Sequence, residues 1–479
     1  MSFCNRFDGG FIKTFSESTQ GGGVCKESYI TCSPTDASPQ YSRHSWWCWP
    51  ALSGAAAVDD ITAIIVALSG DASPAPGNPT FSSFDEPMAD SVGDVVFQAF
   101  LSDERDGIFF KKNKKGSTVE LISATDVAIP GFGTPTFYDG PAISPNGIIA
   151  FVAGSFTIVP VAPAGTPSIS EPVFTYAVLR QRPKKPLEII AKTGDVAPGT
   201  GGAVFTSFDD LAVNRKGDVA FIASYTGNKT GIFLSTKKEL MPVVLSGDSL
   251  PGTGGTTDGF LDGPWLNEKD DVAFAPDSVS GAQQFEGSIF LKKFKKPIES
   301  LLLMGATAPS SVGGVIVGIN VGRPALNNQD VLAFKADTDV SLLVATATVS
   351  SPESFVGAVR PEKGITVCAI QGQGAPDTAG TFDGFGSPAL AGNTLEFRSD
   401  LIGDGSNPDG IFTCADPTSK KPLVREAVLP SDPKPTGSWG TLEEDSVSQR
   451  WVVFDDEDGS PVGIFITKKP GSAPDNPKS

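Results

Sequence analysis

Histidine is almost absent from this sequence, which narrows the chemistry that the chain can perform. The only one is His44, near the N-terminus and outside the repeats that fill most of the chain. Ser-His-Asp triads, Cys-His pairs and multi-histidine metal centres therefore have no imidazole within the repeats. The GxSxG and GxxxxGK[ST] motifs are missing as well. If the chain is an enzyme, its catalytic groups would therefore have to be carboxylates.

Long apolar runs and an excess of positive charge are also missing. No segment approaches the roughly 20 consecutive apolar residues that a membrane-spanning helix needs, so no transmembrane segment is expected. The chain has 37 Lys and Arg residues against 55 Asp and Glu residues, and its formal net charge is −18. Because an acidic surface repels phosphate backbones, nucleic acid is not an expected partner.

Glycine, proline and phenylalanine are abundant instead. The 479 residues include 53 Gly, 39 Pro and 32 Phe, but only 4 Met. Glycine and proline favour turns, and regularly spaced Phe, Val and Ile can build a core. This composition is typical of a turn-rich, all-β protein and argues against a helical bundle.

An internal repeat organises the chain. Residues 205–248 contain four short apolar segments separated by turns, and the same order recurs along the sequence. One phenylalanine of the second segment marks the seven copies: Phe97, Phe151, Phe221, Phe274, Phe334, Phe397 and Phe454. Each unit is too small to bury both of its faces alone. Seven such units predict a seven-bladed β-propeller of four-stranded antiparallel blades.

The two ends of the repeated region predict how the ring closes. The seventh unit is followed only by a polar tail and lacks its fourth strand. Residues 61–71, ITAIIVALSGD, form an extra fourth strand before the first complete unit. We expect this strand to complete the last blade, because closure removes an exposed edge. An open solenoid of the same units is the alternative. The predicted domains are an irregular extension (1–60), the propeller (61–470) and a flexible tail (471–479).

The cysteines are unevenly distributed. Two of the six, Cys368 and Cys414, fall in apolar strands, where we expect them to be buried. The other four lie in the first 50 residues and predict a disulfide-stapled extension in an oxidising compartment, with free thiols as the alternative: Cys4, Cys25, Cys32 and Cys48. No basic and apolar leader precedes them, so no signal peptide is visible.

One repeat carries a recognisable motif. The stretch Asn214-Arg-Lys-Gly-Asp-Val-Ala-Phe221 resembles the repeat of the bacterial choice-of-anchor tandem repeat, NxxGxxAF-containing proteins, and partial copies end at Phe151, Phe274 and Phe334. The resemblance covers about 61–466. It implies a secreted or surface-attached propeller-like protein, and it brings no activity with it.

Acidic residues recur where the first strand of each unit enters the ring. Five units have an acid there, and Gly322 and Gly386 hold this position in the other two. The acids are Asp85, Asp139, Asp209, Asp262 and Glu443. Carboxylates that converge on a channel mouth raise one another's pKa or recruit a cation, for which calcium is the candidate. Alternatively, each acid accepts a local hydrogen bond in a turn.

Basic residues gather in the turns between the third and fourth segments. Such turns lie on one face of a propeller, so the sequence predicts a basic rim opposite an acidic face. This rim includes Lys111, Lys112, Lys184, Lys185, Lys292, Lys293, Lys295, Lys296, Lys420, Lys421, Lys468 and Lys469. It could dock an anionic surface or polymer or an acidic face of a second copy, or it could simply maintain solubility and discourage edge pairing.

These features favour a non-catalytic interaction or structural module, extracellular or on the cell surface. Its expected partner is a protein, a polysaccharide or another copy of the chain. No cofactor is expected apart from a bound cation. The alternative is a carbohydrate-active hydrolase or lyase that uses the acidic residues in a central funnel.

Overall fold

A computed structural model describes residues 63–468 of the chain. It leaves out 161–169, 261, 324, 340–341, 345–346, 350–353, 406–407, 430–431, 433–441, 448–450 and 457–462. The predicted extension with Cys4, Cys25, Cys32 and Cys48, together with Lys469 and the tail, lies outside the described residues. The division into extension, propeller and tail therefore stays a prediction.

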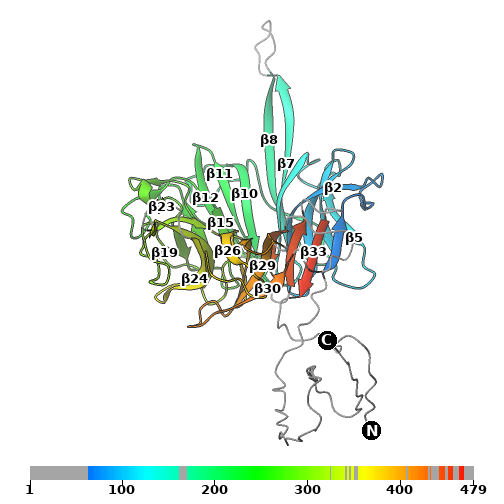
Figure 1. The fold of residues 1–479 in the computed structure, drawn as a ribbon. Helices are drawn as coiled ribbons and strands as arrows, with labels where there is room; N and C mark the ends of the chain where they lie inside the picture. The colour runs from blue at the N-terminus through cyan, green and yellow to red at the C-terminus, as the bar shows by residue number, and fades with distance from the viewer. Residues whose placement is uncertain are drawn as a thin grey trace, which may run out of the picture. The chain divides into compact units, whose positions relative to one another are not determined.

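The described residues form an all-β propeller of four-stranded antiparallel sheets, or blades, which confirms the predicted architecture, although six blades rather than the predicted seven are complete in consecutive strands (Figure 1). Blade 1 consists of β2 (Phe81–Ala89), β3 (Val95–Leu101), β4 (Asp106–Lys111) and β5 (Val119–Ala124). Blade 2 consists of β6 (Phe137–Ile143), β7 (Ile149–Pro160), β8 (Ser170–Gln181) and β9 (Glu188–Lys192). Blade 3 consists of β10 (Phe205–Val213), β11 (Val219–Tyr225), β12 (Lys229–Ser235) and β13 (Leu240–Leu245).

Blades 4 to 6 follow in the same order. Blade 4 consists of β15 (Asp262–Leu266), β16 (Val272–Ala275), β18 (Ile289–Lys292) and β19 (Ile298–Leu302). Blade 5 consists of β20 (Ile316–Asn320), β21 (Leu332–Thr338), β24 (Ser354–Arg360) and β25 (Gly364–Ile370). Blade 6 consists of β26 (Thr381–Phe385), β28 (Thr394–Ile402), β29 (Asp409–Ala415) and β30 (Leu423–Val428), with β27 (Ala389–Ala391) also paired to β28. Short additions are β14 (Thr256–Thr257) with β17 (Val279–Ser280), β22 (Leu342–Val344) with β23 (Ala347–Val349), and the 3₁₀ helix η1 (Gln283–Phe285).

The two ends of the described chain share one further four-stranded sheet. This composite sheet contains β31 (Leu442–Val447), β32 (Trp451–Asp456), β33 (Gly463–Lys468) and, at its edge, β1 (Ile64–Leu68). Six blades are thus complete in consecutive strands, whereas the last three strands take their fourth from the front of the chain. The predicted pairing is confirmed, because Ile64 lies opposite Ile466 and Leu68 opposite Gly463.

The composite sheet repeats a detail of the other blades. A register shift occurs between Ile65 and Ala67, where β1 pairs with β33. The outer strands of blades 1 to 6 carry a comparable shift, as at Ile232/Phe233 in blade 3. β1 therefore has the same irregular pairing as an ordinary outer strand.

Phenylalanine packing explains why the repeat spacing specifies this fold. In blade 3, Phe205, Phe221 and Phe233 are fully buried, and the rings of Phe205 and Phe233 meet edge to face with centroids 4.9 Å apart. Fully burying such a side chain contributes about 1.5–3 kcal/mol. Both faces of a middle strand contact neighbouring blades, so β11 is a continuous apolar run rather than an alternating one.

The β-hairpin of blade 2 extends beyond its sheet. The pairing of β6 with β7 reaches only as far as Gly154, and the pairing of β9 with β8 reaches only as far as Ala177. Residues 155–160 and 170–175 consequently pair only with each other, and they project as an arm from one face of the propeller (Figure 1). We call these residues the β7–β8 arm and this side of the propeller the arm face.

Candidate functional site: the inner wall of the propeller

The asparagine of the repeat motif closes the turn between the first two strands of a blade. The Oδ1 atom of Asn214 accepts hydrogen bonds from the backbone N–H groups of Lys216 and Asp218, both at 3.0 Å. Its Nδ2 atom donates to the carbonyl oxygen of Asn267 in the next blade, at 3.2 Å. One amide therefore shapes its own turn and joins two blades.

The same bond continues around the inner wall. Asn267 donates to the carbonyl of Asn327 at 3.3 Å, and Asn327 donates to that of Gly392 at 2.7 Å. The side chains that make these links from blade 1 to blade 6 form what we call the asparagine belt: Ser91, Asn146, Asn214, Asn267 and Asn327. Each bond contributes about 0.5–1.5 kcal/mol, and the turns are thereby held in a fixed arrangement.

The belt surrounds a cavity of about 480 Å³, which we call the axial cavity. Residues from all six complete blades line it, and the turns that carry the belt form its mouth on the side opposite the arm face. Polar side chains at the mouth include Arg215, Glu268 and Asn328, while Arg323 lies deeper among the inner strands. A cavity of this size, lined by apolar side chains together with several polar ones, is suited to a small molecule that has both polar and apolar parts.

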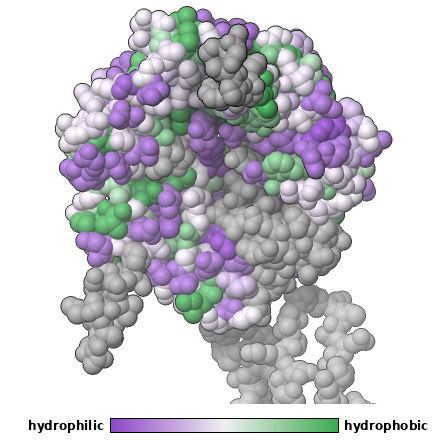
Figure 2. All heavy atoms as spheres, turned by 90° about the horizontal axis from the view of Figure 1, so that it is seen from above, coloured by the Kyte–Doolittle hydropathy of each residue, from purple (hydrophilic) through white to green (hydrophobic). Residues whose placement is uncertain are grey.

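Three of the predicted channel acids influence one another. Desolvation raises the pKa of Asp139 first, and the negative charges of Asp209, Asp210 and Asp85 raise it further, while Arg323 opposes the rise. Arg323 forms an ion pair with Asp210 although the two residues lie in blades 5 and 3. We call Asp85, Asp139, Asp209 and Asp210 the acidic cluster. Figure 2, which looks onto the arm face, shows hydrophilic side chains in the hollow near its middle.

Two predicted members of this set are described only in their backbone. Asp262 lies in β15 opposite Ala275, and Glu443 lies in β31 opposite Asp455. The structure therefore does not show whether their side chains join the acidic cluster. Among the side chains that are described, no group of three or more His, Cys, Asp or Glu residues could hold a metal ion. Calcium stays a prediction.

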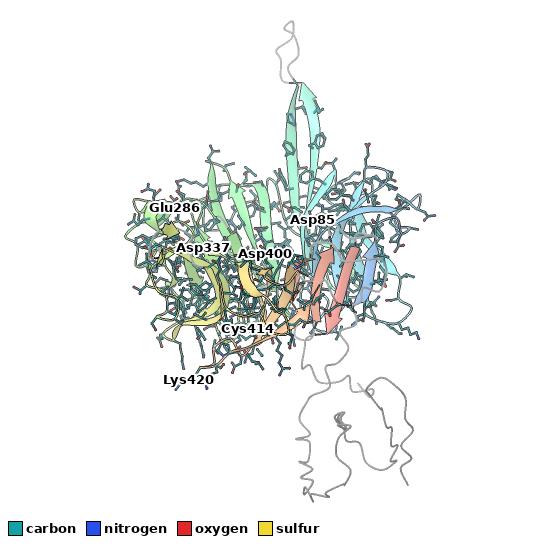
Figure 3. The ribbon with its side chains drawn as sticks, in the orientation of Figure 1. Asp85, Glu286, Asp337, Asp400, Cys414 and Lys420 are labelled. Atoms are coloured by element: carbon teal, nitrogen blue, oxygen red, sulfur yellow. A yellow bond between two sulfur atoms is a disulfide. The ribbon has the colours of Figure 1, made fainter. Side chains whose placement is uncertain are left out.

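Two further acids, which the sequence analysis missed, come from second strands. A Cβ atom on Gly318 of β20 would lie 3.1 Å from Asp337 of β21 (Figure 3). A Cβ atom on Gly384 of β26 would lie 3.1 Å from Asp400 of β28. Each carboxylate covers an inner-strand glycine in one of the two blades that lack the acid. An inner-strand glycine followed by an aspartate in the next strand was the available signal.

The strand register confirms Gly386 at the acid's position in blade 6. It corrects the prediction for blade 5, where Asn320 and not Gly322 holds this position. The reason is that Ile319 pairs with Ala336 as Phe208 pairs with Ala223.

The predicted basic rim divides into paired and exposed residues. Lys111 donates to the carbonyls of Ile65 and Val66, at 3.0 and 2.7 Å, and burial lowers its pKa. Ion pairs hold others, as between Lys112 and Glu120 at 2.5 Å, and the same is true of Lys293 with Glu299 and Lys295 with Glu239. Lys184, Lys185, Lys296, Lys420 and Lys421 are exposed, Lys292 is half-buried, and Lys468 ends β33. Lys420 lies at the end opposite the arm (Figure 3).

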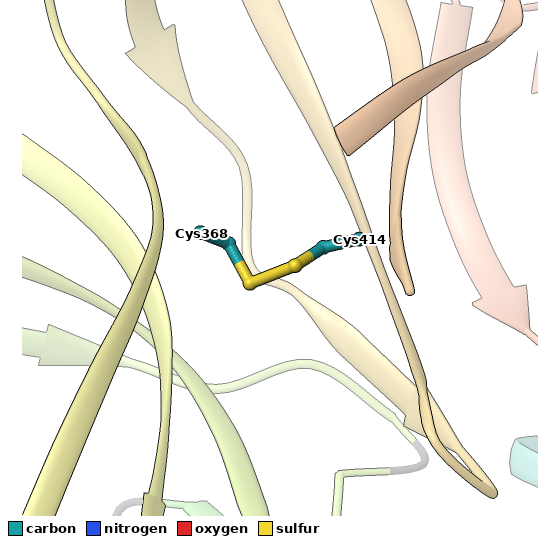
Figure 4. The surroundings of a disulfide bond; sticks show 2 residues. All are labelled: Cys368 and Cys414. Atoms are coloured by element: carbon teal, nitrogen blue, oxygen red, sulfur yellow. A yellow bond between two sulfur atoms is a disulfide. The ribbon is translucent and has the colours of Figure 1, made fainter. Parts of the chain in front are cut away.

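A disulfide joins blades 5 and 6. Cys368 of β25 and Cys414 of β29 are bonded, with Cα atoms 6.2 Å apart, and both are buried (Figure 4). Their predicted burial is confirmed, and the bond between them is an additional feature that the sequence analysis did not predict. The two strands are distant in sequence, yet the curvature of the ring brings the outer strand of one blade against the third strand of the next.

The β7–β8 arm carries unusually exposed apolar side chains. Phe156 and Phe174 are each 45% exposed, and Ile158 is 67% exposed. The two phenylalanine rings lie opposite each other, with centroids 6.0 Å apart. Val159 and Val173 are exposed as well. The arm is thus the place where several large apolar side chains are exposed close together on one described hairpin.

Comparison with solved structures shows only distant likeness. The β-propeller domain of the Trilobed protease from Pyrococcus furiosus is 11% identical, with a TM-score of 0.45, over 84% of this chain and 98% of that one. Acylaminoacyl peptidase from Pyrococcus horikoshii is 8% identical, with a TM-score of 0.42, over 82% and 53%. The GH93 alpha-L-arabinofuranosidase of Fusarium graminearum is 10% identical, with a TM-score of 0.31, over 85% and 98%.

At these identities and scores, the neighbours' activities do not transfer to this chain. No curated protein sequence matches it. In the part of the chain that the structure describes, no helix is both long and apolar enough to cross a membrane. A family model does match residues 58–426, which include blades 1 to 5 and blade 6 as far as the middle of β30. The chain therefore belongs to DUF7453, a family of unknown function.

Proposed function

We propose that this chain is a non-catalytic interaction module that works outside the cell or on its surface, with a protein, a polysaccharide or a second copy of itself as partner. The observation that carries this proposal is the β7–β8 arm. Its exposed Phe156, Ile158 and Phe174 stand clear of the blades, and both backbone edges of the hairpin lack a neighbouring strand among the described residues. Exposed apolar side chains and open strand edges favour association.

The location is supported by two observations. The buried disulfide between Cys368 and Cys414 fits an oxidising compartment. The motif at 214–221, which resembles that of the choice-of-anchor tandem repeat proteins, also favours secretion or surface attachment. Membership of that group of proteins remains part of the proposal.

We also propose that the composite sheet acts as a seventh blade in a closed ring. Its Ile464 and Ile466 pack with Phe81 and Phe109 of blade 1. On its other side, Ile65 and Leu68 pack against a cluster that contains Ile411 of blade 6. The composite sheet thus has neighbours on both faces, as the complete blades do. A rigid ring would present the arm in a fixed direction.

Sedimentation velocity over a range of protein and salt concentrations tests the role of the arm. Association through apolar side chains should persist in high salt, whereas stacking of basic on acidic faces should weaken as salt screens the charges. The double variant Phe156→Ser, Phe174→Ser should abolish the salt-resistant association. The matched control Ile402→Ser changes another apolar side chain, which is 58% exposed, and should associate like the wild type.

A glycan array with the same variants addresses a polysaccharide partner. Binding that the double arm variant loses and Ile402→Ser retains would support the arm as the contact site. If the wild-type protein neither self-associates nor binds any glycan through the arm, the proposed role for the arm is wrong.

The acidic cluster supports a second candidate, a carbohydrate-active hydrolase or lyase. A carboxyl with a raised pKa near a second carboxyl is the arrangement that glycosidases use for general acid catalysis, and Asp139, whose pKa is raised by desolvation and by the charge of Asp209, has this property. A reducing-end assay on purified protein with oligosaccharide substrates tests this function. Turnover that Asp139→Asn abolishes would establish it, and absence of turnover in the wild type would reject it for those substrates.

A further inference from the structure

The axial cavity opens on the face opposite the arm, so it is separate from the contact site proposed above. Its walls combine buried side chains, such as Ile143 and Leu326, with half-buried ones that still expose apolar surface, including Met88, Ala212 and Leu266. The asparagine belt fixes the surrounding turns. The cavity is therefore present before any ligand arrives, and binding would require little reorganisation.

One basic side chain is held at the mouth of this cavity. The backbone N–H of Arg215 donates to Oε2 of Glu268 at 2.9 Å, and its side-chain Nε lies 3.7 Å from Oε1 of the same carboxylate. The backbone carbonyl of Arg215 accepts a bond from Asn146 at 3.1 Å, and the N–H of Glu268 donates to Asn328 at 2.8 Å. Bonds from blades 2 and 4 thus hold the backbone of Arg215, and its guanidinium lies beside Glu268, whose own backbone is held by Asn328 of blade 5.

The terminal nitrogens of Arg215 are the groups that can bind a ligand. Within the described part of the chain, no hydrogen bond from either Nη atom is recorded, and the side chain is 44% exposed. A guanidinium binds a carboxylate through two parallel N–H···O bonds. Asn328, Gln329 and Asn393 surround it with amide groups at the mouth.

Charge determines which way a ligand would lie. Arg323, the basic residue deeper in the cavity, is already paired with Asp210 of the acidic cluster. A ligand carboxylate would be repelled by that cluster, so it would stay at the mouth, and the rest of the molecule would extend between the apolar walls. We propose that the axial cavity binds an organic carboxylate with an apolar body, and that Arg215 holds its carboxylate.

Two sources could supply this chemistry: a free amphiphilic acid, or the C-terminal carboxylate of an apolar peptide. Isothermal titration calorimetry on the full chain would use octanoate with octanamide as its neutral match. A second pair would be an acetylated tripeptide of leucine and valine with a free C-terminus and the corresponding C-terminal amide. We expect binding of at least one carboxylate and at least tenfold weaker binding of its amide. Which carboxylate binds more tightly identifies the source.

Variants assign the binding to the cavity. Arg215→Gln should weaken carboxylate binding at least tenfold, and Arg215→Lys should retain part of it, because the charge remains but the two-pronged geometry is lost. Ala212→Phe should weaken binding of both members of a pair by filling the cavity. Arg425→Gln, on exposed β30, is the matched control and should bind like the wild type.

Melting temperatures check that each variant is folded. Equal affinity for an acid and its amide, no effect of Arg215→Gln in a folded variant, or no heat with any probe at millimolar concentration would each overturn the proposal.

Discussion

At the scale of single residues, the repeat motif acts through hydrogen bonds that cross between blades. Asn327 is 7% exposed; its Oδ1 accepts from the N–H groups of Gln329 and Val331, and its Nδ2 donates to Gly392 of the next blade. A side chain with two acceptor bonds and one donor bond at a buried site is difficult to replace. The asparagine of the motif is therefore a structural requirement of the inner wall.

Substitution of Asn327 should show this role. Asn327→Ala removes all three bonds and should lower the free energy of unfolding by about 2–4 kcal/mol. Asn327→Asp keeps the two acceptor bonds but turns a carboxylate toward the carbonyl of Gly392. The stability that this variant loses should therefore come from the broken bond between the two blades. Urea denaturation measures both. The control Asn393→Ala, at an exposed position, should change stability by less than about 0.5 kcal/mol; an equal loss there would contradict the argument.

A second residue-scale prediction concerns Glu426, in the outer strand of blade 6. Desolvation, together with the charges of Asp432 and Asp377, raises its pKa to about 7. The native state therefore binds a proton that the unfolded chain releases above its ordinary value of 4.5. The associated stability is present below pH 4.5 and is lost as the pH rises to about 7.

The variant Glu426→Gln should therefore differ from the wild type only at higher pH. Its melting temperature should match that of the wild type near pH 4 and exceed it near pH 8. Glu362→Gln, at an exposed position with no ion pair among the described residues, should show no such divergence. Differential scanning calorimetry across this range would contradict the assignment if the two curves stayed parallel.

At the scale of strands, the positions of individual strands could be predicted, because each depends on a short stretch of sequence. Phenylalanine spacing located the second strand of every blade, and the apolar segment at 61–71 located β1. Contacts between residues far apart in the sequence were harder to foresee. Asp337 and Asp400 reach over glycines of the neighbouring strand in the same blade, and Cys368 meets Cys414 of the next blade. These contacts depend on the pairing register within a blade and on how successive blades pack, which no short sequence pattern records.

The disulfide should stabilise the pairing of blades 5 and 6. It spans 46 residues, and cross-linking a loop of that length removes chain entropy worth about 4 kcal/mol from the unfolded state. The double variant Cys368→Ala, Cys414→Ala should lose about 2–4 kcal/mol in urea denaturation. The wild-type protein unfolded in the presence of dithiothreitol should lose a similar amount. A double variant as stable as the oxidised wild type would show that the bond adds nothing.

At the scale of the whole molecule, we expect stability to depend on the closed ring proposed above. Each blade packs mainly with its neighbours, as in other repeat architectures, so a ring whose ends meet gains one extra interface. In that ring β1 would provide the closure, since it pairs with β33 and its Ile65 and Val66 carbonyls accept bonds from Lys111 of blade 1. If β1 were displaced, β33 would become an exposed edge that could pair with other chains.

The variant Val66→Asp should open the ring at this point, because Val66 is 3% exposed and an unpaired buried charge costs several kcal/mol. Ile64→Asp is the matched control in the same strand, since Ile64 is 43% exposed. Hydrogen exchange should accelerate in β33 and β2 of Val66→Asp but not in β12, on the distant side of the ring, and aggregation should increase with protein concentration. Equal acceleration in β12 would mean that the ring unfolds as one unit. Unchanged exchange in β33 would mean that β1 does not close it.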